Sequence, residues 1–148
     1  MAKHPAQAHE HKPAPQLDFY SHLGIAALLL EKSPYHSQWP LYDADIELVP
    51  PLIFDQCKFY FDSQQNPVAF VTWSNIIEAT KDKLVNQDGQ MQWDDWNSGD
   101  LLLFNDFVAP FGHTREILKD LRNLEWPHKI AFSLRRAQDG SVKKVNHW

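Results

Sequence analysis

Cysteine and long apolar runs are scarce in this sequence of 148 residues. Its one cysteine, Cys57, cannot form an internal disulfide, which favours a reducing compartment and also fits an exported protein that needs no bridges. The longest apolar stretch, Leu23 to Leu30, is far shorter than the roughly 20 residues that span a bilayer. The polar segment before it lacks the layout of a signal peptide. We therefore expect a cytoplasmic protein without a transmembrane helix.

Positive charge is also scarce until the last quarter of the chain. Residues 1–114 carry 6 Lys and Arg against 15 Asp and Glu, whereas residues 115–148 carry 8 against 4. This basic segment favours an acidic protein or a phosphate group as partner, or it is simply a solvated face. A net charge of −5 and the absence of a recognition motif argue against nucleic acid as a partner.

The length and a hydrophobic content of 43% suit one globular domain with a core, which we place at residues 17–148. Residues 1–16 contain three prolines, three histidines and almost no large apolar side chain, so they predict a disordered tail. Neither these histidines nor the acidic cluster of Asp94, Asp95 and Asp100 has the ligand pattern of a metal site, and we expect no bound metal. Asp95 and Asp100 are expected to cap loops.

The apolar spacing predicts an α+β fold with a mostly antiparallel sheet and helices on its faces. The expected order is helix, helix, hairpin, helix, strand, helix, hairpin, where the second helix is either short or an interrupted helical turn because of Pro50-Pro51. These elements are expected within residues 17–32, 43–55, 58–74, 75–87, 101–112, 115–126 and 129–148, with Thr114 as a cap for the sixth.

A strand, a turn at Gly112 and a helix are predicted to follow one another within residues 108–118. Backbone amides at a helix start bind anionic groups well. Small acyltransferases of the Gcn5-related type hold the pantetheine and phosphate of their donor at such a junction, so the layout favours a Gcn5-related acetyltransferase-like fold. The glycine-rich loop that cradles coenzyme A in that superfamily is absent, because the turn contains only Gly112. Free coenzyme A is therefore disfavoured as the donor.

Three strings are more specific: "SPYHSQWP" (33–40), "PVAFVTWSN" (67–75) and "DWNSGDLLLFNDFVAPFG" (95–112). In order and spacing they resemble the RTX toxin-activating lysine acyltransferases, the haemolysin-activator family. The resemblance implies a cytoplasmic enzyme that transfers a fatty acyl group from acyl-acyl carrier protein to internal lysines of an inactive RTX protoxin and thereby activates it. It implies no bound cofactor. The essential pair of that family falls here on His36 and Asp106.

The chemistry of lysine acylation is consistent with a histidine and a carboxylate such as His36 and Asp106. A lysine amine has an ordinary pKa of about 10.4 and is almost wholly protonated near neutral pH, so its attack on a thioester requires a base. Histidine is the side chain that ordinarily changes charge closest to neutrality, and we assign His36 as this base. Asp106 either orients the imidazole or positions the incoming ammonium. A transient acyl group on His36 stays open, since neutral imidazole is also a nucleophile.

The resemblance implies a partner for the basic segment 115–148, because acyl carrier protein is strongly acidic. We expect this carrier to dock beside the turn at residue 112. The candidate donor-binding residues are Gly112, His113, Thr114, Arg115, Lys129, Arg135 and Arg136.

Several alternatives stay open. Trp73, Trp93 and Trp96 fit either a groove for the acyl chain or core packing. Weak membrane association and a homodimer are both compatible with the sequence. The rival functions are a non-catalytic escort of a toxin or carrier protein and an ordinary acetyltransferase that uses acetyl coenzyme A.

Overall fold

The computed structural model describes residues 16–148 apart from positions 88 and 138, so the tail predicted at residues 1–16 lies, except for Gln16, outside the described residues. The helices are α1 (Phe19–Glu31), α2 (Ala44–Glu47), α3 (Val49–Ile53), α4 (Glu78–Asn86) and α5 (Thr114–Asp120). Shorter 3₁₀ turns are η1 (His36–Gln38), η2 (Leu41–Asp43) and η3 (Trp93–Asp95), and a π-helical turn, η4 (Leu121–Glu125), continues α5. The strands are β1 (Cys57–Phe61), β2 (Pro67–Ile76), β3 (Leu101–Val108), β4 (Ala131–Arg136) and β5 (Val142–His147).

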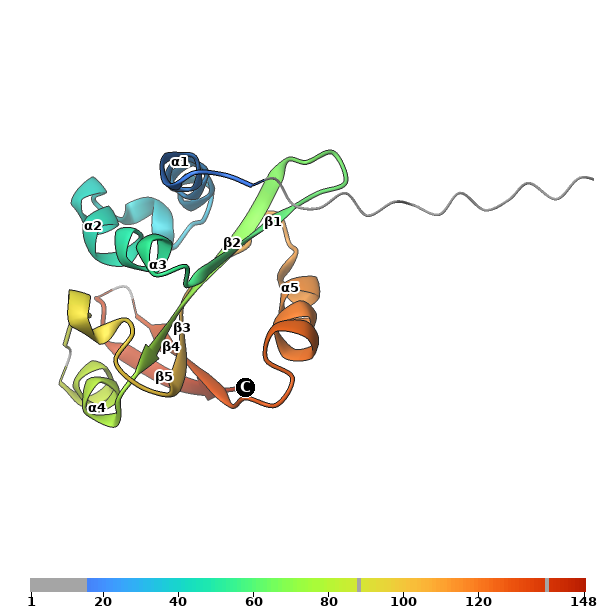
Figure 1. Ribbon diagram of the computed structural model, residues 1–148. Coiled ribbons are helices and arrows are strands. Elements are labelled where there is room, and N and C mark those ends of the chain that lie inside the picture. The colour runs from blue at the N-terminus through green and yellow to red at the C-terminus, as the bar shows by residue number, and fades with distance from the viewer. Residues whose placement is uncertain (1–15, 88, 138) are drawn as a thin grey trace, which may run out of the picture.

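The strands form one sheet in the order β1-β2-β3-β4-β5 (Figure 1). Neighbouring strands are antiparallel except for β3 and β4, which are parallel and are joined by a crossover through α5 and η4. This confirms the predicted α+β fold with a mostly antiparallel sheet. The likeness to Gcn5-related enzymes stays a prediction.

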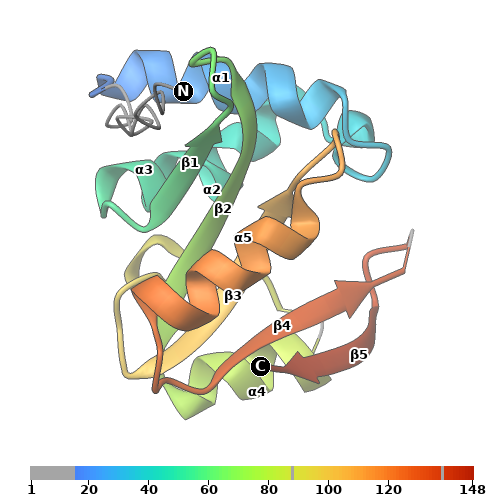
Figure 2. The same cartoon turned by 90° about the vertical axis from the view of Figure 1, so that its right-hand side faces the viewer.

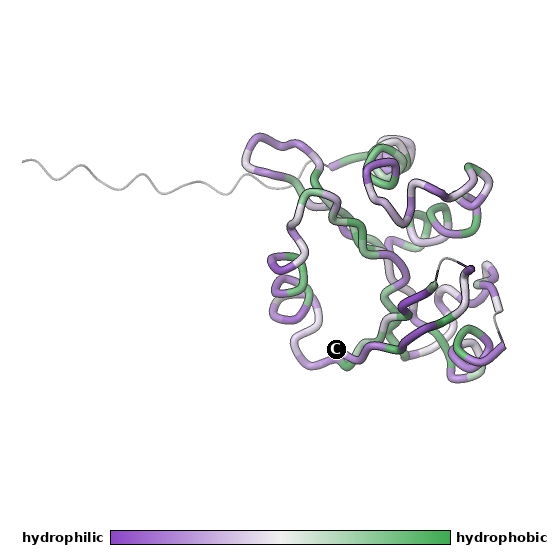
Figure 3. Tube along the Cα trace, turned by 180° about the vertical axis from the view of Figure 1, so that it is seen from behind, coloured by the Kyte–Doolittle hydropathy of each residue, from purple (hydrophilic) through white to green (hydrophobic). Residues whose placement is uncertain are grey.

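Helices cover both faces of this sheet (Figures 1 and 2). On one face, α1 packs through Ala26 and Leu30 against Phe70 and Val108. On the other, α5 and η4 pack on the strands through buried side chains such as Ile117. Hydrophobic positions concentrate along the central strands, whereas the turn between β1 and β2 is hydrophilic (Figure 3). Burial of these apolar surfaces is the main stabilising contribution.

One extra residue interrupts the pairing of β3 with β2. Thr72 lies opposite Asp106, but its neighbour Trp73 lies opposite Phe104, so Asn105 is left over as a β-bulge. Side chains along a strand alternate between the two faces of a sheet, and a bulge shifts this alternation by one residue.

The bulge decides which face Asp106 occupies. Before it, Leu102 and Phe104 pack in the cluster under α5, and after it Phe107 packs against the same cluster. Asp106 and Val108 are therefore turned to the opposite face, where α1 lies. With strict alternation, Asp106 would share the face of Leu102 and Phe104.

Strands β3 and β4 pair along only part of their length. Leu102–Phe104 lie beside Ala131–Ser133, and beyond these residues the two strands separate (Figure 2). Asp106 lies past the last paired residue of β3. Strands β3 and β4 thus separate next to the carboxyl group of Asp106, one of the two predicted catalytic residues.

Two element boundaries differ from the predictions, and one segment takes the second of its two predicted forms. Asn75 and Ile76 belong to β2, and the following helix begins at Glu78, because Ile76 pairs with β3 and is fully buried. Residues 43–55 form two short helices, α2 and α3, separated at Leu48, which confirms the interrupted helical turn rather than one short helix. Pro50 and Pro51 lie in the first turn of α3, where proline is tolerated. Thr114 is the first residue of α5 rather than its cap.

No helix in the described ranges is long and apolar enough to cross a membrane.

Candidate active site

His36 lies in η1, immediately after α1 ends. Pro34 restricts the residue before it and stops the helix, so the chain turns and the imidazole is directed back toward the sheet. The rings of Tyr35 and Trp39 meet the imidazole edge-on, each with centroids 4.9 Å away. His36 is 7% exposed and is thus a buried polar side chain that needs hydrogen-bond partners.

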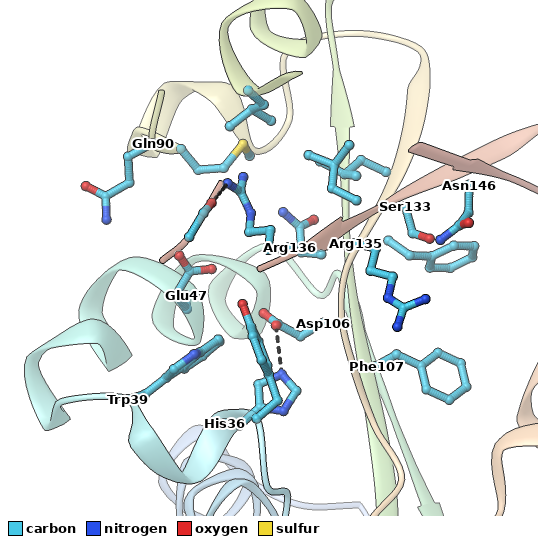
Figure 4. Close-up of a pocket in the computed structure, with 18 of the residues that line it drawn as sticks. His36, Trp39, Glu47, Gln90, Asp106, Phe107, Ser133, Arg135, Arg136 and Asn146 are labelled. Carbon is cyan, nitrogen blue, oxygen red and sulfur yellow. Dashed lines mark hydrogen bonds and ion pairs between the residues drawn. The ribbon is translucent and has the colours of Figure 1, made fainter. Parts of the chain in front are cut away.

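The structure brings His36 and Asp106 together across 70 positions of sequence. The Nε2 atom of His36 lies 3.1 Å from Oδ1 of Asp106, and both side chains are buried (Figure 4). The backbone N–H of Asp106 also donates to Oγ1 of Thr72, at 3.2 Å. These contacts hold the carboxyl group and the imidazole in one fixed arrangement.

Ser33 completes the surroundings of the imidazole, since its Oγ lies 2.7 Å from Nδ1 of His36. A carboxylate only accepts hydrogen bonds, so Nε2 carries a proton when it faces Asp106, and Nδ1 of the neutral ring then accepts from the Ser33 hydroxyl. Because a hydroxyl both donates and accepts, Ser33 can also satisfy the other tautomer. Sequence reasoning did not assign Ser33 a role, although its spacing of three residues from His36 within a turn is a usable signal.

The second carboxyl oxygen of Asp106 is an open acceptor. This Oδ2 atom is buried and has no hydrogen-bond partner among the described residues, and the same is true of Oδ1 of Asn105 in the bulge. Both residues line a cavity of about 850 Å³, which is within the roughly 300–1,000 Å³ of ligand pockets. An unpartnered buried acceptor is costly to maintain, and a substrate N–H group would satisfy it.

The cavity lies where β3 and β4 separate, and its walls come from both faces of the sheet. Tyr35, His36 and Glu47 line it on the side of α1–α3, whereas Leu118 of α5 and Trp148 line it on the other side. A substrate pair can therefore meet at Asp106 from two directions.

Glu47 is a functional candidate that sequence reasoning missed. It ends α2 and lines the same cavity, with Arg136 and Asp106 nearby (Figure 4). Burial, followed by the negative charge of Asp106, raises the pKa of Glu47 to about 8, against the opposing effect of Arg136. Perturbed carboxyl groups of this kind cluster at functional sites.

A family model for the RTX toxin acyltransferase family matches residues 15–148. The chain belongs to this family. The match covers the whole described fold, including the strands that carry Asp106 and the turn that carries His36. It confirms both the family and the enzyme class expected from the three sequence strings, and the protein is an acyltransferase.

Individual relatives of this acyltransferase agree with the family. It is 31% identical to the leukotoxin-activating lysine-acyltransferase LtxC of Aggregatibacter actinomycetemcomitans, over 85% of this chain and 74% of the relative. It is 29% identical to the lysine-acyltransferase RtxC of Vibrio cholerae serotype O1, over 83% of this chain and 85% of the relative. It is also 29% identical to the protein-lysine myristoyltransferase HlyC of Escherichia coli, over 85% of this chain and 71% of the relative.

The seven residues predicted to bind the acyl donor do not form one cluster in the acyltransferase. Thr114, Arg135 and Arg136 line the central cavity. Gly112, whose positive φ of 93° suits glycine, lines a second hollow along α5 together with Thr114 and Arg115. That hollow also contains the cationic side chains of Lys119 and Arg122.

The other two predicted donor residues contribute differently. Nδ1 of His113, at the start of α5, is buried and has no hydrogen-bond partner among the described residues. Lys129 is exposed in the loop before β4 and does not line either hollow. The sequence placed Lys129 near the others because it shares their charge, but charge alone does not determine where a loop lies.

The remaining candidates are structural. Burial raises the pKa of Cys57 to about 12, which makes its thiol unreactive. Trp96 is fully buried in the core, and the tryptophans that line the cavity are instead Trp39 and Trp148. Asp95 accepts hydrogen bonds from Thr80, Lys83 and the backbone of Gln92, which confirms its loop-capping role. Across the described ranges, no three His, Cys, Asp or Glu side chains are grouped so that they could hold a metal ion.

Proposed function

We propose that this acyltransferase moves a fatty acyl group from acyl-acyl carrier protein to internal lysine side chains of an RTX protoxin, in the cytoplasm. The names of its relatives, which include a leukotoxin-activating lysine-acyltransferase and a protein-lysine myristoyltransferase, support a lysine acceptor and a fatty acyl group. The observation that carries the chemistry is the buried contact between His36 and Asp106, whose free Oδ2 borders a cavity open to both faces of the sheet.

In the proposed reaction the acceptor's ammonium group docks against Asp106 and Nε2 of His36. Ser33 accepts from Nδ1–H in this state, so that Nε2 is free to take a proton from the ammonium. The imidazolium that results is stabilised by the adjacent carboxylate of Asp106. The neutral amine then attacks the thioester carbonyl and the C–N bond forms. The C–S bond breaks, the imidazolium of His36 gives its proton to the leaving carrier thiolate, and the nitrogen loses its second proton to solvent.

The geometry favours His36 as a base over His36 as an acyl carrier. Nε2 lies 3.1 Å from a carboxyl oxygen, which stabilises a cation at that nitrogen. An acyl group on Nε2 would remove this hydrogen bond and would have to fit between the imidazole and Asp106. Nδ1 is blocked in the same way by Ser33.

The donor is proposed to approach from the α5 side of the sheet. The hollow along α5 carries Arg115, Lys119 and Arg122, and Arg135 is exposed beside the central cavity. Such cations attract an acidic carrier protein and speed its association, an effect that salt weakens. The acyl chain would then extend into the cavity past Leu118.

The test is the intact mass of a lysine-containing RTX protoxin fragment after incubation with acyl-acyl carrier protein and this enzyme. We expect a mass gain of one fatty acyl group that resists hydroxylamine, because amides resist it and thioesters do not. The gain should disappear with His36→Ala and persist with Asp100→Asn, a matched control at an exposed position before β3. If the wild-type enzyme gives no gain with several chain lengths and several protoxins, the proposal fails and a non-catalytic escort becomes the better explanation.

A further inference from the structure

We propose that Glu47 forms, together with Asp106, an anionic seat that receives the ammonium group of the acceptor lysine on the α2 side of the cavity. Glu47 is thus a specificity-determining residue that selects a positively charged acceptor. This inference rests on the lysine acyl transfer proposed above, and it adds a residue that binds the acceptor rather than the donor.

The position of Glu47 is set by the point at which helix α2 ends. Helix α2 ends at Glu47, and the next residue, Leu48, is buried in the core under α1. This anchor fixes the last turn of α2 over the cavity. Figure 4 shows Glu47, Arg136 and Asp106 around the same part of that space, with His36 below them.

Negative charge exceeds positive charge around Glu47. The groups that act on it are Asp106 from β3, Asp43 from η2 and Arg136 from β4, and the phenol of Tyr35 lines the same space. No ion pair joins Glu47 to Arg136 in the described chain, and Oδ2 of Asp106 has no described hydrogen-bond partner. Two carboxyl groups, those of the partly buried Glu47 and the buried Asp106, thus face the cavity without an ion pair to Arg136, and a bound ammonium group would supply the charge that they lack.

Acceptor binding should therefore release a proton from the enzyme. With a pKa of about 8, Glu47 holds a proton through most of the neutral range, whereas a bound ammonium group favours the ionised carboxylate. The bound state has fewer protons than the free state, so acceptor affinity rises as pH increases toward 8. It levels off above that value, until the lysine itself loses its charge near its ordinary pKa of about 10.4.

The donor offers no comparable interaction, since a thioester carries no positive charge. If Glu47 binds the acceptor, its replacement should therefore change the KM for the acceptor and leave the KM for the donor unchanged. If Glu47 instead worked with Arg136 to hold the donor, its replacement would raise the KM for acyl-acyl carrier protein. If Glu47 only supported the fold, its replacement would lower the melting temperature and leave both KM values unchanged.

The experiment compares Glu47→Gln with Asp45→Asn, a matched control on an exposed position of the same helix. Initial rates are measured between pH 6.5 and 8.5, with an RTX protoxin fragment as acceptor and acyl-acyl carrier protein as donor. For the wild-type enzyme we expect the acceptor KM to fall about twenty-fold over this range, as a group with a pKa of about 8 becomes ionised. Glu47→Gln should lose this fall and show an acceptor KM about ten-fold above wild type at pH 8.5, with kcat and donor KM within about two-fold.

Calorimetry on the wild-type enzyme tests, without any variant, whether Glu47 and Asp106 bind the acceptor's ammonium group. Binding of the protoxin fragment is measured in two buffers with different ionisation enthalpies, which counts the protons released. We expect close to one proton at pH 7 and close to none at pH 9.5. No proton release at pH 7, or an unchanged acceptor KM in a folded Glu47→Gln enzyme, would overturn the proposal. Absence of any acyl transfer by the wild-type enzyme would instead contradict the proposed function, so the two failures are distinguishable.

Discussion

Replacement of Asp106 by asparagine tests whether the buried carboxyl group serves catalysis or the fold. In the wild-type enzyme, Nε2 of His36 lies 3.1 Å from Oδ1 of Asp106. Asparagine has almost the same shape as aspartate, and its carbonyl oxygen can still accept a hydrogen bond from this Nε2. The backbone bond to Thr72 is unaffected, because it uses the N–H of residue 106. The substitution therefore removes a negative charge and leaves the arrangement of groups in place.

The effect on stability follows from two opposing contributions. A hydrogen bond to a charged group contributes about 1.5–3 kcal/mol and a neutral one about 0.5–1.5 kcal/mol, so Asp106→Asn loses roughly 1 kcal/mol at that contact. The buried Oδ2 of Asp106 has no partner among the described residues. The amide nitrogen that replaces it is unpartnered too but carries no charge, so the desolvation cost at this position falls and offsets part of that loss. We expect the free energy of unfolding to stay within about 1 kcal/mol of wild type or to rise.

Activity should respond very differently. General acid–base catalysis contributes about 10²–10⁴-fold, and the carboxylate both receives the ammonium and stabilises the imidazolium, so we expect acyl transfer to fall by about that factor. The assay pairs urea unfolding with initial rates of acyl-lysine formation at pH 8, with Asp100→Asn as the control.

Two results would refute this reasoning. A loss of more than about 3 kcal/mol in the free energy of unfolding would assign Asp106 to the fold, because the weaker hydrogen bond to His36 accounts for at most about 2.5 kcal/mol. A folded Asp106→Asn enzyme that keeps more than a tenth of the wild-type rate would remove its charge from the mechanism.

Three further predictions concern other parts of the chain. Ser33→Ala should lower kcat about ten-fold because Nδ1 of His36 loses its partner, and Ser33→Thr, which keeps the hydroxyl, should recover activity in the same rate assay. The partly buried thiol of Cys57, whose pKa is raised to about 12, should react with a disulfide reagent at pH 8 only slowly until guanidinium unfolds the protein. Rapid reaction of the folded enzyme would contradict the raised pKa. Gly99→Ala should destabilise by at least about 2 kcal/mol, since a Cβ would lie 2.6 Å from a backbone carbonyl oxygen of β2, whereas Gly24→Ala, in an open position of α1, should stabilise by about 0.5–1 kcal/mol in urea unfolding.

The order of elements and the two principal site residues could be predicted from the sequence. Helical periodicity in residues 19–31, β-branched and aromatic runs around Asn66-Pro67, and the apolar run that contains Asp106 all report on local conformation, which neighbouring residues largely determine. An ionisable group within an apolar strand is unusual enough to stand out. The pairing of His36 with Asp106 came from resemblance to a family, since no local signal links two residues that are 70 positions apart.

Only the tertiary structure decided which face of the sheet Asp106 occupies and which side chains surround it there. The bulge at Asn105 exists because β2 and β3 pair in a register that buries apolar side chains on both faces, and strand register depends on contacts between distant residues. Glu47 looks like an ordinary solvated acid in "DADIE", and only the packing of α2 over the cavity partly buries it beside Asp106 and raises its pKa. Residue types are fixed by the sequence, whereas burial and proximity arise only when separate elements pack. His36 and Asp106 could therefore be named as a candidate pair before the structure was known, and Glu47 beside them could not.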